Sequence, residues 1–400
     1  NGKPVREIAE YGFKNCYALK TVSIPDTIEV IATTAFIDCS NIAEYKIREA
    51  VEGSPVTQPK YTVGDNGELL EHNYTTGDVE LAFIPSTITQ NYGTYTVPSN
   101  VTRLSEYLFN RAKFIKVVIP ASVTEVSAYA FQSCSNLAEI EFLATKKADK
   151  DETQIEVKPL TISKDFIDSC SNLREIIFPE RLQEVEDITT VLSQFKELES
   201  ISVVGSCEGQ VYTSYDGMLC NNTAAGADTV IYCPISKEFT NLNKDTDKDP
   251  YYVWNIPSNI TKIGSNAFNI TYKPYENYQY NLNKIVFPSL MVEIGDHAFY
   301  DMAFLREVVF TGDGSGNHSG FTIGDYAFAK CDNLSKVEFT EEGEMTRQED
   351  VFTYKATTTC GITSIGSHAF DGCPLTKILL PSTLEEVGEY AFAYNDALTD

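Results

Sequence analysis

Ile263-Gly264-Ser265-Asn266-Ala267-Phe268 is one copy of a phrase that recurs along this chain of 400 residues. Residues 294–299, 323–328 and 365–370 repeat it with small changes. We call its last position the Phe slot, which falls at Phe13, Phe36, Phe109, Phe131, Ile167, Leu192, Phe268, Phe299, Phe328, Phe370 and Phe392. The shortest spacing is 22 positions, from Phe109 to Phe131, and longer intervals carry insertions. A fixed period of this length predicts a repeat protein.

A second phrase follows the Phe slot, as in residues 173–179, which read Leu-Arg-Glu-Ile-Ile-Phe-Pro. It recurs at 19–25, 282–288 and 375–381. Alternating apolar residues over so short a run predict a strand with one buried face. Proline ends the strand because it has no N–H to donate. We therefore expect each unit to be one coil with a strand, a turn, a short helical Ala-Phe segment and a return.

A single coil of this kind cannot bury its apolar face, whereas stacked coils form a continuous core. The sequence predicts an α/β repeat protein: one solenoid over residues 1–400, with a parallel β-sheet on one face and short helices or turns on the other. Regular repeats occupy 1–47, 98–204 and 257–400, and two longer, β-rich coils occupy 48–97 and 205–256. No stretch between them has the composition of an interdomain linker.

The charge balance excludes some classes of partner. The chain has 57 Asp and Glu against 31 Lys and Arg, a formal net charge of −26. Such a surface repels nucleic-acid phosphates and anionic lipid head groups. No run of 18 apolar residues is present, so no membrane insertion is expected.

These phrases resemble the BspA-type leucine-rich repeat (LRR), in which Leu-x-x-Ile-x-Ile-Pro is followed by Ile-Gly-x-x-Ala-Phe-x-x-Cys-x-x-Leu. The pattern departs from that consensus at 186–192 and 43–47, and it stops at Asp400 where another strand is due, so we expect either that the chain continues or that its cap is missing. The resemblance implies a secreted or bacterial cell-surface protein that binds a host extracellular protein or glycan, or another microbial surface. It implies neither catalytic residues nor a cofactor.

Six cysteines occupy one slot three residues after the Phe slot, namely Cys16, Cys39, Cys134, Cys170, Cys331 and Cys373. Ala112 and Met302 take the same place, so the slot is interpreted as a packing position with buried thiols. We expect the coils to spread on this side beyond the distance that a disulfide spans. Cys220 and Cys233, which flank the loop 221–232, are the better candidates for a bridge.

The search for metal-binding and catalytic residues gives weak candidates. Residues 245–249 begin like a calcium loop, but Pro250 and Ile256 replace the required Gly and Glu, which favours a solvated acidic loop. The sequence contains no C-x-x-C pair, so a structural zinc site is not expected. His297 and His368 precede Ala-Phe in what we interpret as a variable surface position on separate coils, without a neighbouring nucleophile. We therefore predict no metal site and no enzyme. The register of Ile256 places Trp254 in the core.

Two regions are candidates for binding. The insertion 272–280 contains Tyr272, Tyr275, Tyr278 and Tyr280, and tyrosine is frequent in recognition surfaces. The outward strand positions include an acidic centre of Glu139, Glu141 and Glu175. The alternative for the tyrosines is that their rings cover the adjacent coil. The alternative for the glutamates is that they form an ordinary solvated face.

These candidates lead to a hypothesis of a non-enzymatic, adhesin-like binding protein. The alternative is a structural spacer that presents another module at the cell surface. A glycan-active hydrolase would need paired carboxylates in a cleft, and an open face of glutamates argues against it.

Overall fold

A computed structural model describes residues 5–49, 56–145, 157–224, 226–244, 249–268, 280–312, 320–339, 343–348, 351–356 and 361–399. The chain divides into two compact units. Unit 1 comprises Asn1–Val191 with Val203–Tyr212, and unit 2 comprises Leu192–Ser202 with Thr213–Asp400. The single array over 1–400 stays a prediction.

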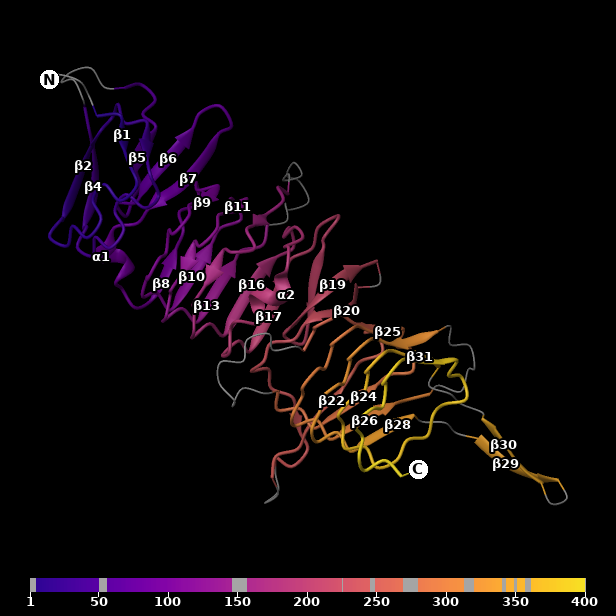
Figure 1. The fold of residues 1–400 in the computed structure, drawn as a ribbon. Helices are drawn as coiled ribbons and strands as arrows, with labels where there is room; N and C mark the ends of the chain where they lie inside the picture. The colour runs from indigo at the N-terminus through magenta and orange to yellow at the C-terminus, as the bar shows by residue number, and fades with distance from the viewer. Residues whose placement is uncertain are drawn as a thin grey trace. The chain divides into compact units, whose positions relative to one another are not determined.

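In unit 1, the strands that end near the proline of each repeat pair in parallel as a first ladder (Figure 1). Its order is β16 (Glu175–Pro179), β13 (Glu139–Phe142), β10 (Lys116–Ile119) and β8 (Thr94–Thr96), with β2 (Thr21–Pro25) and β4 (Glu44–Arg48) as a separate parallel pair. Alternate residues are buried, as in Ile140 and Phe142 of β13. The predicted parallel, one-sided strands are confirmed.

A second ladder, which the sequence reasoning missed, runs through the aliphatic residues that follow each proline. In unit 1 its order is β14 (Thr161–Ile162), β11 (Glu125–Val126), β9 (Arg103–Leu104), β7 (Asp78–Phe83), β6 (Leu69–Asn73) and β5 (Tyr61–Val63). Two further parallel pairs join β1 (Glu7–Ile8) to β3 (Val30–Ile31) and β12 (Phe131–Gln132) to β15 (Ile167–Asp168). The aliphatic residues that recur after each proline were the sequence signal for the second ladder.

Unit 2 has the same two ladders. The first contains β22 (Tyr252–Asn255), β24 (Lys284–Phe287), β26 (Glu307–Phe310) and β28 (Lys336–Phe339), with β21 (Thr240–Asn241) antiparallel to β22. The second contains β19 (Met218–Thr223), β20 (Gly226–Tyr232), β23 (Lys262–Ile263), β25 (Glu293–Ile294), β27 (Phe321–Ile323), β31 (Ile362–Ile365) and β32 (Glu386–Val387). The hairpin β29 (Gly343–Gln348) and β30 (Val351–Ala356) is an insertion, and β17 (Ser200–Val204) and β18 (Tyr212–Tyr215) lie at the division of the units.

The Phe slots of neighbouring repeats stack ring on ring in the core. Phe299 and Phe328 have ring centroids 5.1 Å apart, and Phe370 lies 5.2 Å beyond Phe328. All three side chains are fully buried. Each such pair contributes about 1 kcal/mol beyond the burial of its area, so the Phe slot stabilises the contact between units of the repeat.

The Ala-Phe segments are turns, so the predicted short helices are wrong for them. The N–H of Phe268 donates to the carbonyl of Ala298 in the next repeat (2.9 Å), and Phe299 donates to Ala327 (2.8 Å). We call these bonds the turn ladder. Because the N–H groups bond between repeats, they cannot form the bonds of a helix within one repeat. The turn side is therefore hydrogen-bonded from repeat to repeat and does not spread as expected.

Two short helices are present within the described residues, α1 (Ser86–Thr89) and α2 (Ile188–Leu192). Both occupy places where the Ala-Phe phrase is absent from the sequence. Neither is long and apolar enough to cross a membrane. The strand expected at 375–381 does not form, although Leu375 is buried. Leu379, which an alternating strand would direct outward, is 70% exposed and gains no partner strand.

The cysteine slot is a buried hydrogen-bonding position. Cys134 donates its thiol to the carbonyl of Phe109 (2.9 Å), and Cys331 donates to Phe299 (3.3 Å). The burial predicted for the slot is confirmed for Cys39, Cys134, Cys170, Cys331 and Cys373. It is wrong for Cys16, which is exposed because its repeat is the first of the described residues and no earlier described repeat covers it.

The candidate bridge between Cys220 and Cys233 does not form, since both thiols are free and buried. The antiparallel register of β19 and β20 places Cys220 opposite Val230, which leaves Cys233 beyond the end of that pairing. The two long coils are β-rich as predicted: β5, β6 and β7 form an antiparallel meander, and β19 and β20 form a hairpin.

Candidate interaction surface

The outward positions of the first ladder form continuous rows, because the strands pair without a shift in register. In unit 1 one row contains Thr94, Lys116, Glu139 and Glu175 as successive Cα partners. The next row contains Thr96, Val118, Glu141 and Ile177. We call this outward side of the first ladder the strand face. The structure thus brings Glu139, Glu141 and Glu175 together on two adjacent strands, and their role in binding stays a prediction.

The acidic centre of unit 1 contains a cation. Lys116 Nζ lies 2.7 Å from Glu139 Oε1 and 2.6 Å from Glu141 Oε2. These hydrogen bonds raise the pKa of the Lys116 ammonium. About a quarter of each of the three side chains is exposed, at 27%, 27% and 26%. The face is therefore an ordered array of paired charges instead of a purely acidic patch.

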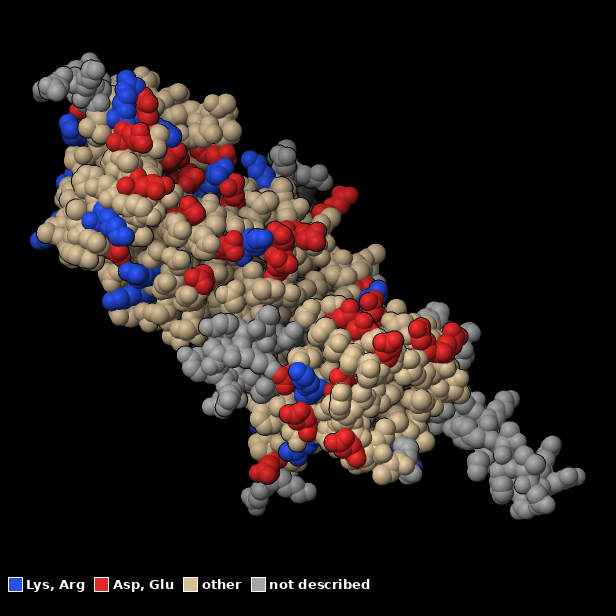
Figure 2. Space-filling view, viewed as in Figure 1, with Lys and Arg blue, Asp and Glu red and all other residues tan. Residues whose placement is uncertain are grey.

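Unit 2 repeats this arrangement with the charges interchanged. Glu307 on β26 lies between Lys284 on β24 (3.1 Å) and Lys336 on β28 (2.9 Å). Lys336 also contacts Glu338 at 2.7 Å. Figure 2 shows acidic side chains across the visible face with basic ones beside them. In both units, therefore, opposite charges pair across neighbouring strands of the first ladder.

The environment of Glu307 sets its ionisation. Its side chain is 16% exposed, and this burial raises the pKa of the carboxyl group. Hydrogen bonds from Lys336 and Lys284 act in the opposite sense and outweigh burial, so the net pKa lies below the usual value of 4.5. The carboxylate is consequently charged at neutral pH and can accept bonds from a ligand only in competition with two lysines.

The tyrosine-rich insertion divides between described and undescribed residues. Tyr272, Tyr275 and Tyr278 lie outside the described residues. Tyr280 is wrong as a surface candidate, because its side chain is 1% exposed. Its hydroxyl donates to the carbonyl of Cys233 (2.6 Å), and its ring packs 5.3 Å from that of Phe268. Tyr280 therefore covers the neighbouring coil, which was the alternative reading of these rings.

An aromatic stack on the turn side of unit 2 was missed. The rings of His297, Tyr326, His368 and Tyr390 lie 4.9, 4.6 and 5.0 Å from one another in that order. Each residue adopts a positive φ near +55°. The sequence places all four in the position before Ala-Phe on separate coils, and the structure adds that their rings stack from one coil to the next. Their recurrence at the repeat period was the signal for the stack.

The candidates for metal-binding and catalytic residues can be placed where the structure describes them. The described residues contain no group of three His, Cys, Asp or Glu side chains that could hold a metal ion. Residues 245–248 of the calcium-like segment lie outside them. His368 Nδ1 lies 2.8 Å from Asp371 Oδ2, and no described serine or cysteine side chain hydrogen-bonds to this pair as a nucleophile would. Trp254 is 5% exposed, so its predicted place in the core is confirmed.

Parallel ladders, a turn ladder and a polar strand face define a repeat protein whose units stack through an aliphatic and phenylalanine core. Six copies of the BspA type Leucine rich repeat region match residues 2–55, 87–153 and 269–399, more than half of the chain. The chain belongs to the BspA-type leucine-rich repeat family.

Solved structures with this kind of repeat are similar at low identity. A leucine rich cell surface protein from Faecalibacterium prausnitzii A2-165 is 19% identical, with 87% of this chain and 95% of that chain covered and a TM-score of 0.39. A leucine-rich repeat protein from Bacteroides ovatus ATCC 8483 is 17% identical, with 99% and 81% covered and a TM-score of 0.46. The pneumococcal vaccine antigen PcpA is 15% identical, with 85% and 80% covered and a TM-score of 0.35. No curated protein matches the chain significantly.

Proposed function

We propose that this chain is a non-enzymatic, adhesin-like protein, secreted or held on a bacterial cell surface, that binds a partner through its strand face. The partner is a host extracellular protein or glycan, or another microbial surface. In this proposal the stacked repeats of each unit form a leucine-rich-repeat solenoid, and such folds bind along an extended face.

The in-register rows of the strand face carry the proposal. Lys116, Glu139 and Glu141 are held by ion pairs, so a ligand meets an ordered set of charges and loses little side-chain entropy in binding them. The aliphatic residues Val118 and Ile177 lie in the second row beside Glu141. A surface that combines ordered charges with aliphatic area suits a protein or glycan with its own mixed surface.

A binding screen tests the proposal. The purified chain is applied at physiological ionic strength to an array of matrix proteins, mucins and glycans, beside Glu141→Lys and the control Glu10→Lys. Glu10 is exposed in a turn of unit 1, away from the first ladder, so its variant makes the same change of charge elsewhere. We expect Glu141→Lys to weaken a saturable hit about tenfold, and Glu10→Lys to change it less than about twofold.

Two results count against strand-face binding. Equal binding by both variants, with unchanged melting temperatures, places the contact on another surface. A folded wild-type chain that binds nothing on the array favours the second candidate function, a structural spacer that presents another module.

A further inference from the structure

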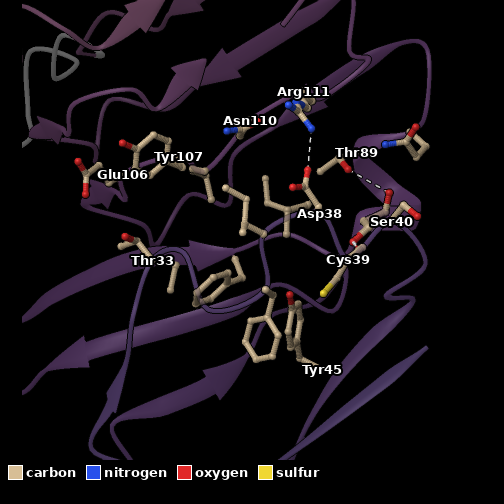
Figure 3. A pocket seen from close by; sticks show the side chains of 18 of the residues that line it. Thr33, Asp38, Cys39, Ser40, Tyr45, Thr89, Glu106, Tyr107, Asn110 and Arg111 are labelled. Carbon is tan, nitrogen blue, oxygen red and sulfur yellow. Dashed lines mark hydrogen bonds and ion pairs between the residues drawn. The ribbon is translucent and has the colours of Figure 1, made fainter. Parts of the chain in front are cut away.

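A cavity of about 430 Å³ opens on the turn side of unit 1 (Figure 3). It lies between the Ala-Phe turn of residues 33–40 and the equivalent turn of residues 106–111, and we call it the turn-side cleft. Phe36, Tyr45 and Phe83 form apolar parts of its lining, and Thr33, Asp38 and Asn110 contribute polar groups. A cavity of this volume and mixed lining has the character of a ligand site.

The cleft exists because the long coil between these two turns has no Ala-Phe turn of its own. After β7 the chain enters α1, where the N–H of Thr87 donates to the carbonyl of Ile42 (3.0 Å). Phe83 still packs against Phe36 in the core, with ring centroids 5.3 Å apart. The core is thus continuous while one rung of the turn ladder is missing. A rung here is the turn of one repeat together with its hydrogen bonds to the next. When one rung is missing, the turns on either side of the gap should lie two strand spacings apart, about 10 Å. That separation leaves room for one extended backbone.

The missing rung leaves hydrogen-bond donors on one rim of the cleft. In the repeat before it, Phe13 N–H donates to Ala35 O (2.9 Å) and Asn15 N–H donates to Ile37 O (3.2 Å). The equivalent donors of the next turn are the N–H groups of Phe36 and Asp38. No acceptor for either group occurs among the residues that the structure describes.

The opposite rim carries the matching acceptors. The carbonyls of Leu108 and Asn110 occupy the positions that Ala35 and Ile37 hold in their own turn, and no described residue donates to them. The next contact along unit 1 is complete again, since Phe109 N–H donates to Ala130 O (2.8 Å). Donors on one side and acceptors on the other therefore face a single gap.

Unit 2 shows how the same gap is closed when the chain fills it. There the second long coil supplies Cys233, whose N–H donates to the carbonyl of Ala267 (2.9 Å). The buried hydroxyl of Tyr280 donates to the carbonyl of Cys233. The cleft of unit 1 is consequently a property of that unit and does not follow from the presence of a long coil alone.

We propose that the turn-side cleft of unit 1 binds an extended peptide segment of a partner protein, which supplies the missing rung of the turn ladder. Carbonyls of alternate peptide residues accept from Phe36 and Asp38, and N–H groups of the intervening residues donate to Leu108 and Asn110. Peptides add to exposed backbone edges in this way. A saccharide has no such ordered alternation of donors and acceptors along two edges. This site is separate from the strand face and does not depend on the function proposed for it.

The charges on the rim favour a cationic peptide. Arg111 Nη1 and Asp38 Oδ1 meet across the cleft at 2.6 Å, and Figure 3 shows the arginine side chain reaching the carboxylate from the opposite rim. The Arg111 side chain is 70% exposed, so displacing it costs little. Glu106 also lines the cleft, and the chain carries a net charge of −26. A peptide with Lys or Arg beside its extended segment gains from this field.

Selection from a phage-displayed library of random heptapeptides tests the proposal. Phage that bind the full chain are counter-selected against Thr33→Trp, whose indole fills the cleft, and the recovered peptides are synthesised. Fluorescence anisotropy then measures their affinity for wild type, Thr33→Trp and the open control Thr33→Ala. We expect Thr33→Trp to weaken binding at least tenfold and Thr33→Ala to leave it within about threefold, with all three chains melting at similar temperatures.

A scan of N-methylated peptides tests the backbone pairing without altering the protein. Removing an N–H that donates to Leu108 or Asn110 should weaken binding about tenfold, and methylation of the residues between them should have a smaller effect. We expect the loss of affinity to alternate along the peptide, so that N-methylation weakens binding strongly at every second residue. Failure to recover any peptide that discriminates wild type from Thr33→Trp overturns the proposal. An affinity that is indifferent to N-methylation at every position also overturns it.

Discussion

The glycine of the Ile-Gly phrase shows how closely neighbouring repeats approach. A Cβ built on Gly324 would lie 2.7 Å from the backbone nitrogen of Asp296, and one on Gly366 would lie 2.6 Å from the carbonyl carbon of Gly324. Neither glycine has a positive φ, so contact with the adjacent backbone explains the residue and conformational freedom does not. The sequence showed that the position recurs as glycine, but the reason is visible only when the repeats are stacked.

Gly324→Ala should lower the free energy of unfolding by about 2 kcal/mol, because the added methyl group overpacks a contact between two backbones. Gly93→Ala is the matched control, since a Cβ there meets nothing within 4 Å. Urea unfolding followed by circular dichroism measures both changes. A stability loss no larger for Gly324→Ala than for Gly93→Ala would show that the repeats do not approach as described.

At the scale of the element, the sequence predicted the strands better than the turns. Alternation and the final proline identified the first ladder, since a strand has one buried face whatever its neighbours do. The Ala-Phe segments were expected to be helical, but the N–H of Phe299 bonds to Ala327 of the next repeat. A hydrogen-bond partner in another repeat cannot be recognised from the six residues of the phrase alone. The same limitation hid the stack of His297 and Tyr326.

Glu307 joins three strands of unit 2, which leads to a prediction about pH. Its pKa is lowered in the folded state, so its contribution to stability is present above the unfolded value near 4.5 and is lost as the pH falls through the folded pKa. Glu307→Gln should lower the free energy of unfolding by about 1 kcal/mol at pH 7. The difference from wild type should shrink as the pH is lowered below 4.5.

Urea titrations at pH 7 and at intervals down to pH 3 measure this difference. Glu338→Gln is the control, because Glu338 contacts Lys336 and its side chain is 47% exposed, so a smaller loss is expected. A deficit for Glu307→Gln that stays constant across the whole pH range would contradict the assigned role of its ionised form.

At the scale of the whole molecule, the repeat period identified the family and the kind of fold, and charge argued against nucleic-acid partners. The candidate site was predicted unevenly. Glu139 and Glu175 were correctly placed on one side because outward positions follow from alternation. Tyr280 was misplaced because a loop gives no periodic signal of which ring turns inward. The turn-side cleft was missed, since a missing rung is recognised only beside the rungs that form.

Carboxyl footprinting of a bound complex tests whether the strand face is the binding surface. The chain is labelled with a carbodiimide and an amine, free and with a ligand from the array, and modification is measured by mass spectrometry for each carboxylate. We expect the ligand to protect Glu139, Glu141 and Glu175 from modification and to leave the modification of Glu10 unchanged. Protection confined to carboxylates off the strand face, with these three labelled equally in both states, would contradict it.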